Sequence, residues 1–181
     1  MNNIPKIIIP GYGGSGDGHW QTHWETGSVE YDRIVPKSFE NPDLTDWLSS
    51  LEEAVASQSI APILVAHSLG CLLVAEYLNR SKGDVAGAFM VAVPDPDGPN
   101  FPIGQAPDFA KVPHDFLPCP SFIIASGNDP YSEASYTSKI AQLWGAEVVN
   151  IGNKDHISNV GRWDQGRNLL TAFSAGVRKR T

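Results

Sequence analysis

Ser68, Asp129 and His156 are residues whose types and order along the chain could perform acyl transfer. A histidine can remove the proton of a serine hydroxyl, so that the oxygen attacks a carbonyl carbon. A carboxylate beside the histidine holds the imidazole in the productive tautomer and stabilises the imidazolium that forms. The order serine, acid, histidine is typical of sites in which the serine follows a strand of an α/β sheet.

The segment around Ser68 predicts a sharp turn between a strand and a helix. It reads Ala66-His67-Ser68-Leu69-Gly70, a near match to G-x-S-x-G in which alanine replaces the first glycine. Apolar residues before and after it supply the strand and the helix that this motif requires. The alternative is an ordinary turn. His67 is expected to pack beside the turn, because neighbours on a tight turn point in different directions.

Asp129 and His156 follow later strands. Asp129 lies in SGNDPY, a sequence that is also ordinary turn chemistry, and Asp95 and Asp97 are alternative acids. His156 ends GNKDH and is the only histidine after Asp129. The base is therefore expected to be His156.

A glycine-rich segment, Gly11-Tyr12-Gly13-Gly14, follows the first apolar run. An attacked carbonyl becomes an oxyanion that needs hydrogen-bond donors, and the amides of Leu69 and Tyr12 are the predicted donors. The same segment also matches G-x-G-x-x-G, the fingerprint of dinucleotide-binding redox proteins. That alternative is disfavoured because Asp32 lies near the start of the next strand rather than at its end. No cofactor is predicted.

His19 and His23 are spaced like a metal-binding pair, but the segment lacks the glutamate of H-E-x-x-H and a third ligand. Trp20 and Trp24 are expected to pack together, with the histidines facing solvent or the pocket rim. Cys71 and Cys119 form no C-x-x-C pair. No metal site is predicted.

Short apolar runs alternate with amphipathic segments along the whole chain. The pattern predicts one α/β domain over residues 1–181, with a mostly parallel sheet of about six strands and helices on both faces. Asn41 is the expected cap of one helix and Ser132 of another. The strands are predicted at 6–10, 31–35, 62–66, 86–93, 121–126 and 147–151, and helices after 41, 68, 132 and 163.

The composition fits a globular protein with a net charge of −7. An acidic chain repels phosphate backbones and anionic lipid surfaces, so neither nucleic acid nor membrane is a predicted partner. No apolar run is long enough to span a bilayer, and the first residues carry no signal pattern. A cytoplasmic location is expected, and nothing indicates an oligomeric state.

Four segments together resemble a known family: PGYGGSGDGHW, AHSLGC, SGNDPY and DHISNVGRWDQG. They are similar to small serine hydrolases related to retinoblastoma-binding protein 9 and the bacterial YdeN-like proteins. The resemblance implies a compact, capless α/β-hydrolase with its triad on Ser68, Asp129 and His156. The sequence departs from the family pattern at Ala66 and Asp155, where glycine is usual. The L-x-C-x-E motif associated with retinoblastoma-protein binding by the vertebrate member is absent, so the resemblance implies no such protein partner.

The resemblance implies hydrolysis of small acyl substrates, with esters, aminoacyl esters and peptides as candidates. A shallow pocket is predicted, although each of its predicted wall residues could equally belong to the core. A non-catalytic binding protein on the hydrolase scaffold is the alternative function. The predicted pocket walls are Trp20, Pro94, Phe101, Phe109 and Trp163.

Overall fold

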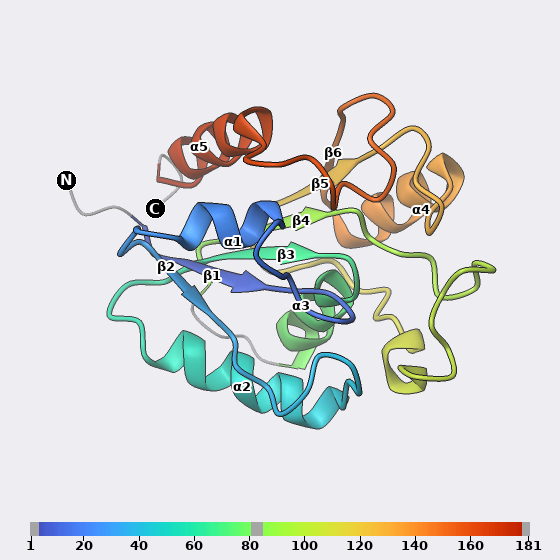
Figure 1. Cartoon of the computed structure of the whole chain (residues 1–181), viewed down its shortest axis with the longest axis horizontal. Coiled ribbons are helices and arrows are strands. Elements are labelled where there is room, and N and C mark those ends of the chain that lie inside the picture. Colours follow the sequence, from blue (N-terminus) through green and yellow to red (C-terminus); the bar gives the residue numbers. More distant parts are fainter. Residues whose placement is uncertain (1–3, 81–84, 179–181) are drawn as a thin grey trace.

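A parallel six-stranded sheet runs through the protein (Figure 1), in a computed structural model that describes residues 4–80 and 85–178. The strand order is β2-β1-β3-β4-β5-β6, and every pair of neighbours is parallel. This confirms the predicted architecture. The strands are β1 (Lys6–Ile9), β2 (Tyr31–Arg33), β3 (Ile63–His67), β4 (Gly87–Val91), β5 (Ser121–Ala125) and β6 (Glu147–Asn150).

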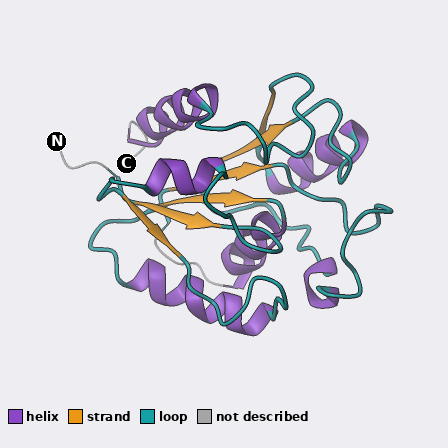
Figure 2. Cartoon of the chain, viewed as in Figure 1, coloured by secondary structure: helices purple, strands orange, loops and turns teal. Residues whose placement is uncertain are grey.

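Helices cover both faces of the sheet (Figure 2) because alternate strand residues point to opposite sides. Ile8, Val65 and Phe89 pack on one face with residues of α1 (Trp20–Glu25) and α5 (Asp164–Arg178). Ile7, Leu64 and Met90 pack on the other face. That second cluster includes residues of α2 (Leu44–Ala56), α3 (Leu69–Arg80), α4 (Ala134–Trp144) and the 3-10 helix η1 (Pro107–Ala110).

Two predicted helix caps are wrong. The cap of α2 is Asp43 rather than Asn41, because the Asp43 carboxylate accepts a 2.8 Å hydrogen bond from the Asp46 amide. The residue before α4 is Glu133 rather than Ser132. The Ser132 hydroxyl lies instead 3.2 Å from that of Thr137, inside the first turn.

The chain changes direction across the sheet at β1, which lies between β2 and β3. Loops after two such strands diverge and leave a crevice at their carboxyl ends, where ligands bind in α/β sheets. The register pairs Ile9 with Ala66, so the glycine-rich loop after β1 lies beside the turn after β3. No helix of residues 4–80 and 85–178 has the length and apolarity needed to cross a bilayer.

Candidate active site

Ser68 lies on the turn between β3 and α3, in a left-handed backbone conformation with φ 54°. Non-glycine residues rarely adopt this conformation, and such strain is concentrated at functional sites. The Ser68 amide donates a 2.9 Å hydrogen bond to the carbonyl of Val91, which holds the turn against β4. The side chain is partly exposed, whereas Ala66, His67 and Leu69 around it are buried.

Two glycines allow the backbone to approach this turn closely. A Cβ at Gly70 would lie 2.6 Å from the carbonyl oxygens of both Ile9 and Pro10, too close for any real side chain. A Cβ at Gly11 would lie 2.8 Å from Cβ of Ser68 and 3.3 Å from its Oγ. The glycine-rich loop therefore packs directly against the candidate nucleophile.

The structure brings Ser68, His156 and Asp129 together as one hydrogen-bonded chain. Nε2 of His156 lies 2.7 Å from Oγ of Ser68, and Nδ1 lies 2.9 Å and 3.0 Å from the two carboxylate oxygens of Asp129. An ionised carboxylate can only accept, so Nδ1 carries the ring proton and Nε2 is free to accept the serine proton. This is the arrangement that nucleophilic catalysis requires.

The Asp129 side chain is only 3% exposed, and the amide of Tyr131 donates a 2.9 Å hydrogen bond to its Oδ1. This turn orients the carboxylate toward the imidazole. Asp95, an alternative acid at the sequence level, has a different role, because its Oδ1 accepts from the amide of Asp97.

The loops that carry Asp129 and His156 are joined to each other by side chains. Asn128 accepts from the Asp155 amide at 2.9 Å and donates from Nδ2 to the Asp155 carboxylate at 2.7 Å. The Ser126 hydroxyl accepts from the Lys154 amide at 2.8 Å. The Asp155 carboxylate therefore bonds to Asn128. Because φ of Asp155 is 47°, its position favours glycine, which fits the glycine that the family resemblance implies there.

Trp20 holds the chain on the other side of His156. Its indole Nε1 donates a 2.9 Å hydrogen bond to the carbonyl of Ile157, a buried residue with φ 51°. Trp24 makes a similar bond, also 2.9 Å, to the carbonyl of Arg162. The helix α1 thereby fixes the segment that follows the candidate base.

The His67 ring bonds to the backbone carbonyl of His156 and not to the ring nitrogens of His156. Its Nε2 donates to the His156 carbonyl at 2.9 Å, since a carbonyl can only accept. Burial lowers the pKa of His67 well below its usual value, and His156 and His19 add to the effect. His67 therefore remains neutral and supports the base, in addition to the packing role predicted for it.

The predicted oxyanion donors lie on two adjoining segments. Leu69 is the first residue of α3, so its amide has no partner inside the helix. On the neighbouring loop, the amides of Gly13 and Gly14 already donate to the carbonyls of Phe39 and Gly11. The role of the Tyr12 amide as the loop donor stays a prediction.

Among the predicted pocket walls, Trp163 lines an 830 Å³ cavity together with His156 and Tyr131. The Tyr131 ring lies 4.3 Å from that of His156, a contact that its place in the SGNDPY motif could have suggested. Trp20 has no exposed surface, so its prediction as an open wall is wrong. Phe101 and Phe109 also belong to the hydrophobic core, and Pro94 is buried.

His19, which was expected to face solvent or the pocket rim, is half-buried. It is the N-cap of α1, and its Nδ1 accepts a 3.2 Å hydrogen bond from the Gln21 amide. Burial and the charge of Arg33 lower the pKa of His19 to about 4. Within residues 4–80 and 85–178, no three His, Cys, Asp or Glu side chains come close enough together to hold a metal ion.

The parallel sheet and its strand–turn–helix serine define a protein of the α/β-hydrolase class. The chain belongs to the serine hydrolase family, whose sequence model matches residues 6–172. No curated protein matches this sequence significantly.

Solved structures of hydrolases are similar to this one over nearly its whole length. A protein described as a YdeN-like hydrolase from Pectobacterium atrosepticum has 28% identity and a TM-score of 0.86, covering 97% of this chain and 92% of its own. The ydeN gene product of B. subtilis shares the fold at 22% identity and a TM-score of 0.77, covering 96% of this chain and 100% of its own. These matches confirm the family resemblance seen in the sequence.

Proposed function

We propose that the protein hydrolyses small carboxylic esters through an acyl-enzyme on Ser68. The observation that carries this proposal is the hydrogen-bonded chain from Ser68 through His156 to Asp129, with 2.7 Å between Ser68 Oγ and His156 Nε2. Aminoacyl esters and peptides contain the same reacting carbonyl and are further candidates.

In this mechanism Ser68 Oγ attacks the ester carbonyl while His156 Nε2 takes its proton. The amides of Leu69 and Tyr12 stabilise the oxyanion, and each such donor typically contributes about 3 kcal/mol. His156 then protonates the leaving alcohol as the ester C–O bond breaks. A water molecule gives a proton to His156 and attacks the acyl-enzyme. His156 returns this proton to Ser68 Oγ as the acyl–oxygen bond breaks, which releases the carboxylic acid and free Ser68.

A small acyl group is proposed because the part of the chain that the structure describes has no separate cap over the serine to enclose a long acyl chain. Between β4 and β5, the described chain forms loops and the four-residue helix η1 rather than a separate cap. The aromatic side chains Phe101 and Phe109 of that segment are buried in the core. Short acyl esters should therefore be hydrolysed faster than long ones. Faster turnover of a long-chain p-nitrophenyl ester than of the acetate would contradict this part of the proposal.

Labelling with a fluorophosphonate probe tests the mechanism directly. We expect the wild type to be labelled, and Ser68→Ala and His156→Ala to lose labelling while remaining folded. Ser158→Ala is the matched control, because Ser158 lies two residues after His156 in the sequence and lines the same cavity. A folded wild type that is not labelled, or labelling that persists in Ser68→Ala, would refute the proposal and favour the binding-protein alternative.

A further inference from the structure

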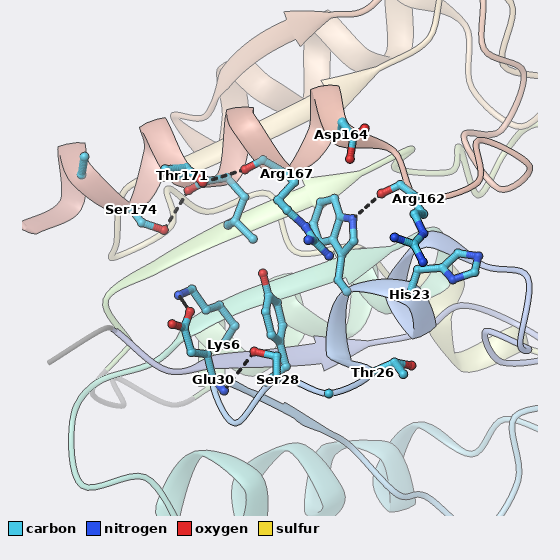
Figure 3. Close-up of a pocket in the computed structure, with 15 residues that line it drawn as sticks. Lys6, His23, Thr26, Ser28, Glu30, Arg162, Asp164, Arg167, Thr171 and Ser174 are labelled. Atoms are coloured by element: carbon cyan, nitrogen blue, oxygen red, sulfur yellow. Dashed lines mark hydrogen bonds and ion pairs between the residues drawn. The ribbon is translucent and has the colours of Figure 1, made fainter.

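A second cavity, of about 680 Å³, lies between α5 and the segment that joins α1 to β2 (Figure 3). Its volume is typical of a small-molecule site. Lys6 and Tyr31, the first residues of β1 and β2, belong to its lining. The cavity thus opens at the amino ends of these strands, whereas Ser68 follows the carboxyl end of β3. It is a different cavity from the one at His156, although Arg162 and Asp164 belong to the lining of both.

Two arginines line this cavity. Arg162 and Arg167 extend from the start of α5 toward the space above α1 (Figure 3). In residues 4–80 and 85–178 neither guanidinium forms an ion pair, whereas Arg33 pairs with Glu25 and Arg80 with Glu76. A guanidinium presents five donors in a planar fork that matches carboxylate and phosphate oxygens. Two such groups without acidic partners, in a chain of net charge −7, indicate a site for an anion.

The acidic residues around the cavity have other interactions. Glu30 pairs with Lys6 at 2.9 Å. Asp164 occupies the first turn of α5, where the helix dipole favours a carboxylate. The charges of Arg162 and Arg167 are therefore not neutralised by direct pairing with these carboxylates.

Tyr31 adds a hydrogen-bond donor to the lining of the cavity. Burial raises the pKa of Tyr31, while the nearby positive charge of Arg167 opposes the rise. The phenol thus stays protonated beside Arg167 and can donate to an oxyanion. Trp24 and Leu170 lie behind the cavity wall and are almost completely buried.

We propose that this cavity binds a small molecule that carries a carboxylate or a phosphate group. Arg162 and Arg167 bind the anion, and Tyr31 donates a hydrogen bond to it.

Titration calorimetry of the full chain with phenyl phosphate and with benzoate tests the site and distinguishes the two anions. We expect saturable binding that weakens as salt is added, and roughly tenfold weaker binding in Arg167→Gln and in Arg162→Gln. Arg80→Gln, which removes a paired arginine on α3, should leave the affinity unchanged. A shift of the Trp24 indole NMR signal, assigned with Trp24→Phe, should accompany binding.

The rate of ester hydrolysis by Arg167→Gln should equal that of the wild type. An unchanged rate would show that the variant is folded. The proposal is overturned if neither anion binds at millimolar concentration. It is equally overturned if the double variant Arg162→Gln/Arg167→Gln binds like the wild type. Binding that disappears once Ser68 carries the fluorophosphonate would place the anion at the triad and also refute a separate site.

Discussion

The imidazole of His156 is oriented by the residues around it, and its contact with Asp129 decides its tautomer. We expect Asp129→Asn to lower kcat by about 10⁴-fold, because an amide no longer requires Nδ1 to carry the proton. Steady-state ester hydrolysis measures the change. Asp155→Asn is the matched control: its carboxylate bonds Asn128 and lies one residue from His156, and asparagine tolerates the positive φ. Equal losses in both variants would contradict the proposed role of Asp129.

Trp20 acts on His156 through the backbone of Ile157. We expect Trp20→Phe, which keeps an aromatic ring but removes the 2.9 Å hydrogen bond, to lower kcat roughly tenfold with little change in KM. The unsatisfied carbonyl should let the segment after His156 shift. Trp24→Phe removes a similar bond farther along the chain, at Arg162, and should affect kcat less. If Trp20→Phe altered thermal stability alone, Trp20 would have only a structural role.

At the scale of the elements, α3 packs so closely on β1 that residue 70 must be glycine. A methyl group there would lie 2.6 Å from two backbone carbonyls, and neither can move without shifting β1. We therefore expect Gly70→Ala to lower the free energy of unfolding by about 1–3 kcal/mol, as overpacked substitutions do.

Gly176→Ala in α5 provides the opposite case. No heavy atom lies within 4 Å of a Cβ built at Gly176, so the substitution meets open space. Helix propensity should then stabilise the protein by about 0.5–1 kcal/mol. Urea unfolding of both variants measures the pair of effects. Similar changes in the two would show that the contact of α3 with β1 does not control the result at Gly70.

At the scale of the whole molecule, burial of histidines makes stability depend on pH. The pKa of His19 is about 4 in the folded protein and 6.5 in the unfolded chain. Between these values the unfolded chain binds a proton that the folded protein does not, so stability falls as pH decreases from 6.5 toward 4. The contribution of His19 is about 2 kcal/mol, because solvent screens the partly exposed ring. Buried His67 acts in the same direction.

His19→Asn tests this dependence, because asparagine can still cap α1 but does not titrate. Its free energy of unfolding should fall less steeply than that of the wild type over this pH range. The comparison uses slopes, since loss of the ring contact with His67, at 4.8 Å, can change the stability at every pH. Parallel pH profiles would rule out a contribution from His19.

Local patterns in the sequence were sufficient to predict the sheet and the positions of the candidate triad. Continuous apolar runs indicate strands buried on both faces, and alternation with helices requires that they be parallel. The carboxyl ends of parallel strands share one edge, so the loops after β3, β5 and β6 had to bring Ser68, Asp129 and His156 to the same side. The order of these three residues and the turn residues around them were then enough to predict the candidate triad without knowledge of the packing.

Only the tertiary structure decided which aromatic side chains are core and which border a cavity. Trp20 and Trp163 are both aromatic and both mostly buried, yet only Trp163 lines the cavity at His156. The difference depends on how α1 and α5 pack on one face of the sheet, and no local pattern encodes that. The same holds for the Trp20–Ile157 bond and the arginine-lined cavity, because each joins segments more than a hundred residues apart in sequence.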